Sequence, residues 1–170
     1  MLDLPNISDW RIAVFFTAFA IMFGLAMWLG GKPERIGALT LAAMATIQLA
    51  LYSTISTPHW GSVDPVLLVS DLVGLAGFTY LAMHSNRLWP IPACSMSLIS
   101  MMAHFPRFTI DMLGISYAQF NGVPTFAAIV IVTGGVIAHR WRTYRNGPEA
   151  DWVPFDRYAY FRSIVRGEKR

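Results

Sequence analysis

The sequence predicts an all-α, polytopic integral membrane protein, built as a bundle of about five transmembrane helices. Composition is the first reason: 55% of the 170 residues are hydrophobic and only 14% are charged, whereas a soluble domain has about 25% charged residues. Five apolar segments are the second reason. They leave no room for a separate soluble domain, because each membrane helix needs about 20 residues. The predicted spans are 12–29, 36–52, 66–83, 88–105 and 123–138.

The first span, 12–29, is predicted to be a retained helix and not a cleaved signal peptide. Asp3 and Asp9 precede it together with Arg11, so the positively charged start of a signal peptide is missing. The apolar run is also longer than the roughly 7–15 residues of a signal peptide. The segment "GGKPER" at 30–35 has the composition of a turn, and the next span therefore runs back across the membrane.

The third span, 66–83, is long enough to cross, but the fourth segment, 88–105, is marginal. Its uninterrupted apolar part, 92–103, extends about 18 Å as a helix, against a hydrocarbon core of about 30 Å. It crosses the membrane only if Leu88 and Trp89 act as interface anchors. Otherwise it is a re-entrant or partly buried segment.

Lysine and arginine are unevenly distributed between the two predicted sides. With five spans, 11 of the 13 basic residues lie on one side and 2 on the other. Cytoplasmic loops are enriched in Lys and Arg, so the N-terminus is predicted outside and the C-terminus in the cytoplasm, in a plasma (bacterial inner) membrane. A sixth helix at 108–120 would place Asp111 in lipid or in the protein interior, and five spans are preferred. The minority side holds Arg11 and Arg107; the majority side holds Lys32, Arg35, Arg87 and eight residues of 140–170.

The remaining segment, 140–170, is predicted to be a basic, aromatic cytoplasmic tail. Its aromatic and basic residues recur near helical spacing, which fits an amphipathic helix on anionic lipid. An ordinary positive-inside flank, partly disordered, and a docking surface for a partner protein fit the same residues. The candidate lipid or partner contacts are Arg140, Arg142, Arg145, Trp152, Arg157 and Arg162.

Asp71 is the main candidate for a functional residue. A charged carboxylate inside a membrane is costly and normally faces protein or water and has a partner. Because successive spans alternate in direction, Asp71 lies about 8 Å below the outer end of its span. Gln48, His104 and His59 fall near the same level, and we expect these four residues to form an intramembrane polar cluster. The candidate partners of Asp71 are Gln48, His104 and Arg107, and no comparable set is expected in the inner half of the spans.

Two interpretations of Asp71 remain open. It serves a proton or cation step or contacts a ligand, or it forms a hydrogen bond that packs two helices together. Ser70, Gly74 and Gly77 recur at i, i+4 and i+7 on the same span. Small residues at this spacing allow close helix approach, which favours the packing interpretation.

No cofactor is predicted. Met101 and His104 share one helix face and are candidate ligands for Cu(I), but methionine is also a common packing residue in apolar chains. The four histidines fall at predicted helix ends or in loops, which does not suit haem ligands placed inside a span. The single cysteine, Cys94, excludes a disulfide within the chain.

The sequence does not favour a catalytic role. The sequence has no G-x-S-x-G, P-loop, H-E-x-x-H or G-x-G-x-x-G motif, and the net charge of +3 is no signal for nucleic-acid binding. The sequence favours a small non-catalytic accessory or assembly subunit of a larger membrane complex, with the lipid bilayer and other membrane subunits as partners. The alternatives are a proton- or cation-coupled transporter or channel component that uses Asp71, and a haem- or copper-binding membrane redox protein.

Overall fold

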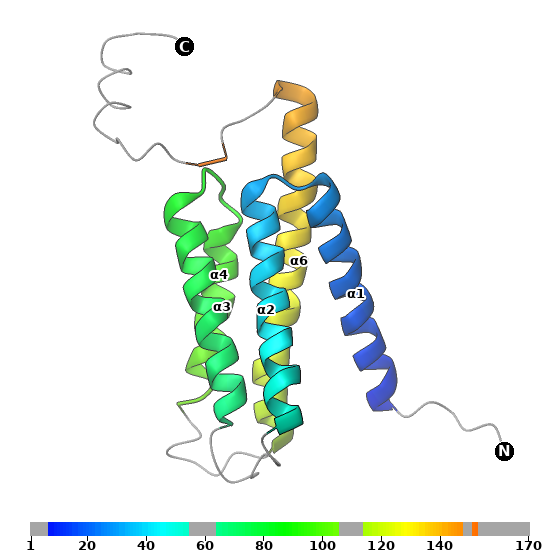
Figure 1. The fold of residues 1–170 in the computed structure, drawn as a ribbon, viewed down its shortest axis with the longest axis vertical. Coiled ribbons are helices and arrows are strands. Elements are labelled where there is room, and N and C mark those ends of the chain that lie inside the picture. Colours follow the sequence, from blue (N-terminus) through cyan, green and yellow to red (C-terminus); the bar gives the residue numbers. More distant parts are fainter. Residues whose placement is uncertain (1–6, 55–63, 106–113, 148–150, 153–170) are drawn as a thin grey trace, which may run out of the picture.

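The chain is all-helical, as predicted. The computed structural model describes residues 7–54, 64–105, 114–147 and 151–152. Within these ranges α2, α3, α4 and α6 stand side by side, and α1 leans away from them towards its N-terminal end (Figure 1). The helices are α1 (Ile7–Leu29), α2 (Lys32–Thr54), α3 (Pro65–His84), α4 (Pro90–Met102) and α6 (Gly114–Asn146).

The length and apolar composition of the helices indicate a membrane protein. Three described segments are long and apolar enough to cross a bilayer: Lys32–Tyr52, Pro65–His84 and Gly122–Asn146. Ala13–Leu29 and Pro90–Met102 are apolar but shorter. The fourth segment, the marginal one in the sequence, is thus also a short helix of 13 residues, about 20 Å long.

The last helix is longer than its predicted span at both ends. It begins at Gly114, and it continues to Asn146, so residues 140–146 of the predicted tail are helical. No helix-breaking residue intervenes between 125 and 146 apart from two glycines. Gly147 then adopts a positive φ of 82°, and its N–H donates to the Thr143 carbonyl at 3.1 Å. A glycine in this conformation is a common helix end, because it carries no Cβ to oppose the left-handed backbone.

The core lies where α1, α2, α3, α4 and α6 face one another, and it is filled mainly by aliphatic side chains and methionine. Phe78, Met22 and Leu81 are its largest fully buried apolar members. The outward faces are apolar too: Trp28 is 85% and Leu49 77% exposed. A soluble monomer rarely exposes so much apolar surface, whereas a bilayer solvates it. The rest of the core is Ala26, Ala38, Leu41, Met44, Ala93, Ala128, Ile129, Val132 and Val136.

The small-residue stripe of α3 faces α2. A Cβ added to Gly74 would lie 2.5 Å from the Met44 Sδ, and one added to Gly77 would lie 2.5 Å from the Thr40 Cγ2. The two backbones therefore approach as closely as these side chains allow, as expected for small residues at a membrane helix interface. The stripe packs helices, as the sequence suggested.

Candidate functional site

Asp71 contacts Ser100 of α4 and His104, which lies two residues after the end of α4. We call this buried group the Asp71 cluster: Asp71, Ser100 and His104. The Asp71 Oδ2 accepts a hydrogen bond from the Ser100 hydroxyl at 2.9 Å and lies 2.9 Å from the His104 Nε2. Ser100 lies in the last turn of α4, and His104 lies in the turn that follows, where its N–H donates to the Met101 carbonyl at 3.3 Å. The three residues are 2%, 3% and 1% exposed, so all three side chains are buried.

The Asp71 cluster can share or pass a proton but is not arranged for nucleophilic catalysis. In a catalytic triad the imidazole lies between the hydroxyl and the carboxylate. Here the hydroxyl and the imidazole both contact the same carboxylate oxygen, so the histidine is not placed to take the Ser100 proton. The cluster can exchange a proton between His104 and Asp71, or its hydrogen bonds can hold α3 and the end of α4 together.

The structure brings together some residues of the predicted polar cluster and separates others. Asp71 and His104 are in direct contact. Gln48 instead donates to the Ser70 hydroxyl at 2.8 Å, one residue before Asp71, and so ties α2 to α3. His59 and Arg107 lie outside the described residues.

The candidate copper ligands do not converge on a metal in the part of the chain described. The His104 Nε2 is directed at Asp71, and Met101 is a half-buried neighbour on the same helix. Among the described residues there is no group of three or more His, Cys, Asp or Glu side chains that could hold a metal ion.

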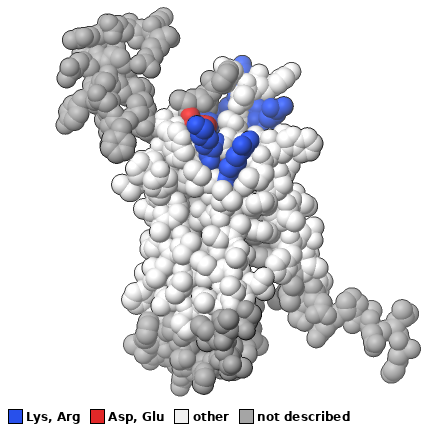
Figure 2. All heavy atoms as spheres, viewed as in Figure 1, with Lys and Arg blue, Asp and Glu red and all other residues white. Residues whose placement is uncertain are grey.

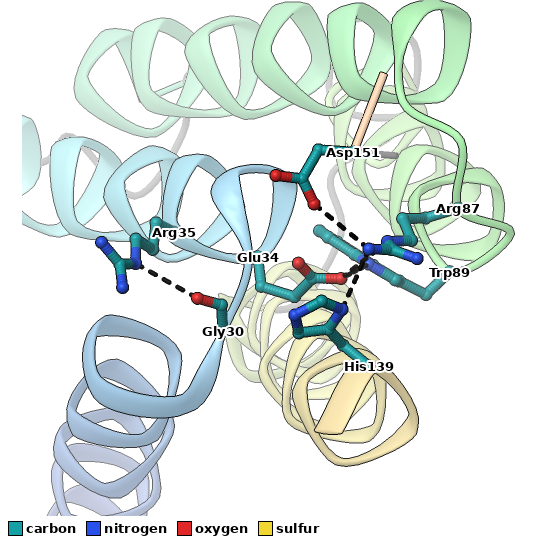
Figure 3. Close-up of polar contacts among 7 residues, drawn as sticks. All are labelled: Gly30, Glu34, Arg35, Arg87, Trp89, His139 and Asp151. Atoms are coloured by element: carbon teal, nitrogen blue, oxygen red, sulfur yellow. Dashed lines mark hydrogen bonds and ion pairs between the residues drawn. The ribbon is translucent and has the colours of Figure 1, made fainter. Parts of the chain in front are cut away.

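A second buried polar group lies at the opposite end of the bundle (Figure 3). We call it the Glu34 cluster, and it joins four separate segments. Glu34 comes from the first turn of α2, Arg87 and Trp89 from the loop between α3 and α4 and its junction with α4, His139 from α6, and Asp151 from the chain that follows α6.

Arg87 is the centre of the Glu34 cluster. Its Nη2 donates to the Asp151 Oδ1 at 3.1 Å and to the His139 Nδ1 at 2.9 Å, and its Nε lies 3.6 Å from the Glu34 Oε1. Arginine can only donate, so the His139 Nδ1 accepts, and a neutral ring carries its proton on Nε2. The side chains of Arg87 and Glu34 are 0% exposed and that of Asp151 is 22% exposed. The guanidinium therefore faces two carboxylates with little water between them.

The second oxygen of Glu34 is less well satisfied. Its Oε1 accepts from the Trp89 Nε1 at 3.0 Å, but its buried Oε2 has no hydrogen-bond partner among the described residues. A Cβ on Gly31 would lie 2.9 Å from this Oε2, 2.8 Å from the Asp151 Oδ1 and 3.1 Å from the His139 Nε2. Only glycine at position 31 lets these three polar atoms approach the same stretch of backbone.

Trp89 fills the space between α2 and α6 beneath Glu34. Its ring lies against backbone at two glycines: a Cβ on Gly37 would be 2.6 Å from it, and one on Gly135 would be 2.7 Å from it. Phe78 packs edge-on against the same ring, with 6.5 Å between centroids. The indole thus joins three helices while its N–H binds Glu34.

No comparable polar set was expected in the inner half of the spans, and the charged residues of the Glu34 cluster lie outside the predicted spans 36–52, 88–105 and 123–138. Arg87 was counted only among the basic residues on one side, His139 only among the histidines at helix ends, and Glu34 was not considered as a site residue. In the structure α2 already begins at Lys32 and α6 extends to Asn146, and the α3–α4 loop folds over the bundle end. The only sequence signal was an Arg and a Glu in short segments that also contain proline, which is also the composition of a turn.

The predicted lipid or partner contacts fall into three groups. Arg140, Arg142 and Arg145 lie on α6, with the Arg145 guanidinium 5.0 Å from the centre of the Trp141 ring. Trp152 is half-buried; it packs against Tyr80 of α3 and forms an isolated bridge with Ser85. Arg157 and Arg162 lie outside the described residues.

Comparisons with protein-family profiles, with curated proteins and with solved structures find no match.

Proposed function

We propose that the chain is a non-catalytic accessory or assembly subunit of a larger membrane complex. The supporting observation is how polar groups are used. The buried charged side chains of both clusters bind the chain's own segments to one another, whereas the outward faces of the helices are apolar. In the face drawn in Figure 2, the described charged residues gather at one end and the sides of the bundle carry none.

The position of α1 supports the same proposal. In the C-terminal half of α1, Met22 and Ala26 are buried in the core. The N-terminal half of α1 leans away from the other helices (Figure 1). A groove of about 390 Å³ lies between α1, α2 and α6, lined by residues such as Phe15, Phe19 and Leu49. Apolar side chains from a partner's transmembrane helix would fill such a groove without leaving a polar group unsatisfied.

We infer that the Glu34 end of the bundle faces the cytoplasm of a bacterial inner membrane. The support is the positive-inside distribution, with 11 of the 13 basic residues assigned to this side. Exposed Lys and Arg side chains gather at this end in Figure 2. Labelling of single cysteines added at each end, in intact cells and in opened vesicles, tests this orientation.

Purification from native membranes in mild detergent tests the accessory role. We expect a native mass well above 19.0 kDa, with partner subunits in fixed ratio. A photo-crosslinking residue at Leu49, in the groove, should capture the same partner. The matched control is Leu72 on α3, which is 46% exposed but does not line the groove. A monomer of 19.0 kDa, or equal capture from both positions, would contradict the proposal.

A second function, a proton- or cation-coupled transport step, is favoured by one contact. Asp71 lies on α3, a helix long enough to cross the membrane, and its carboxylate is 2.9 Å from an ionisable imidazole. Buried ionisable pairs of this kind occur in proton relays. Towards the Glu34 cluster, α3 buries Phe78 and Leu81 in the core, so a proton route through the described part of the bundle would need water beside these side chains.

The flux test separates the two proposals. Asp71→Asn removes the ionisable carboxyl and should abolish a proton- or cation-dependent flux in proteoliposomes. Ser100→Ala removes a hydrogen bond to the same carboxylate but no ionisable group, so it should leave most of the flux. Equal flux in wild type and Asp71→Asn would exclude the transport role and leave the accessory role standing.

A further inference from the structure

We propose that a groove between α1 and α6, at the Glu34 end of the bundle, binds an anionic phospholipid, with an acyl chain in the groove and the phosphate on Arg140. This inference concerns a separate surface and does not depend on the accessory role.

The groove has an apolar floor of suitable size and position. Leu25 and Leu29 of α1 and Val136 and Ile137 of α6 line a volume of about 380 Å³. Ile137 is 61% exposed, so the groove opens sideways, towards the surrounding hydrocarbon. A lipid chain would enter it from the bilayer without crossing a polar barrier.

The rim of the groove is basic and aromatic. Arg140 lines it four residues after Val136, and therefore on the same face of α6. Trp141 and Tyr144 line the same rim and are 60% and 88% exposed. Tryptophan and tyrosine favour the headgroup level of a membrane, which places the Arg140 guanidinium at the depth of lipid phosphates.

Arg140 is available for a phosphate. It is exposed, and within the described part of the chain no side chain forms an ion pair or hydrogen bond with it. Guanidinium groups bind phosphate oxygens through two parallel N–H donors. A basic pocket between membrane helices on one side of the bilayer is a recurring form of headgroup site.

The surrounding charge selects an anionic lipid. Lys32 and Arg35, in the first turn of α2 at this end, are exposed, while the acidic Glu34 and Asp151 are already bound by Arg87. Among the described residues, the surface left to a ligand at this end is therefore positive, and Figure 2 shows basic side chains gathered there. A partner's apolar helix in this groove would instead cover Arg140 with hydrocarbon, which is costly, and lipid is the occupant that the rim favours.

Native mass spectrometry of the full chain, released from nanodiscs of mixed phosphatidylglycerol and phosphatidylcholine, tests the site. We expect wild type to retain phosphatidylglycerol in preference to phosphatidylcholine. Arg140→Gln should weaken this retention about fivefold, the effect of one basic residue at an anionic surface. Lys32→Gln is the matched control, because it removes an equal charge at the same end but does not line the groove, and it should weaken retention less than twofold.

A second pair of variants tests the acyl-chain half. Ile137→Trp fills the groove and should reduce retention of phosphatidylglycerol. Val130→Trp, on an exposed face of α6 that is not part of the groove, should leave retention as in wild type.

Four results would overturn the proposal. They are equal retention of the two lipids by wild type, equal loss in Arg140→Gln and Lys32→Gln, glycerol phosphate without acyl chains binding as tightly as the lipid, and a lipid-free dimer in which a second copy occupies the groove.

Discussion

The two buried clusters differ in how their charges are balanced. In the Asp71 cluster a single carboxylate faces a hydroxyl and an imidazole, and its partners are four residues apart, Ser100 at the end of α4 and His104 just after it. In the Glu34 cluster a permanent cation, Arg87, faces two carboxylates drawn from segments far apart in the sequence. The first cluster can change its protonation, whereas the second is tied to a group that stays charged.

This difference points to different roles. The Asp71 cluster is a candidate for proton transfer, whereas the Glu34 cluster holds segments of the chain together. Removing one partner of a buried ion pair leaves the other charge without compensation. The Glu34 cluster should therefore be the more important for stability, because Arg87 also bonds to His139 and to the chain after α6. Substitutions in the Asp71 cluster should lower stability less, and a transport role of this cluster would show as a loss of flux.

Arg87→Met is expected to have the largest effect. It leaves Glu34 and Asp151 without their cation in a buried site, and breaking such pairs costs about 3–5 kcal/mol. Titration with SDS in mixed micelles, followed by circular dichroism, measures the loss. The control Arg35→Met removes an exposed arginine next to Glu34 and its hydrogen bond from Nε to the Gly30 carbonyl at 3.2 Å, and it should cost about 1 kcal/mol. Equal stability of the two variants would mean that the buried ion pairs of Arg87 do not hold this end of the bundle together.

Gly135→Ala should have the next largest effect. Its new methyl group would be 2.7 Å from the Trp89 ring, and overpacking of this kind costs about 1–3 kcal/mol. Gly134→Ala is the matched control on the same helix, because nothing lies within 4 Å of its added Cβ. Its higher helix propensity should stabilise the chain by about 0.5–1 kcal/mol. If both variants lose stability equally, Trp89 is not closely packed between α2 and α6. The Glu34 cluster, which Trp89 contacts, would then be less rigid than proposed.

Hydropathy and helix direction predict the fold and part of the Asp71 cluster. The apolar runs place five helices in the correct order, and opposite directions of α3 and α4 put Asp71 and His104 at one level. Ser100 was overlooked, although its spacing of four residues from His104 placed both on one helix face. The first, second and last helices were predicted too short, because polar turns interrupt the apolar pattern without ending the helix, whereas α4 (Pro90–Met102) is shorter than its predicted span, 88–105.

The Glu34 cluster could not be predicted in this way. Its contacts depend on the α3–α4 loop and on the return of the chain after α6, where Asn86 N–H donates to the Asp151 carbonyl at 3.0 Å. Periodicity carries no information about such returns. A count of basic residues treats Arg87 as a flanking charge, and nothing in its neighbours distinguishes an arginine that faces water from one that is buried.

The smallest expected loss of stability concerns a hydrogen bond of the Asp71 cluster. Ser100→Ala removes one of the two contacts to the Asp71 carboxylate and should cost about 1 kcal/mol, a typical net value for a hydrogen bond. Ser97→Ala is the control one turn earlier on α4, since Ser97 is also buried but its hydroxyl donates to the Ala93 carbonyl of its own helix. That carbonyl keeps its helical hydrogen bond, so the control should change stability by no more than a few tenths of a kcal/mol. SDS titration of both variants measures the difference. Equal stability would mean that His104 alone holds the carboxylate, and the serine would then be a neighbour of the pair and not part of the cluster.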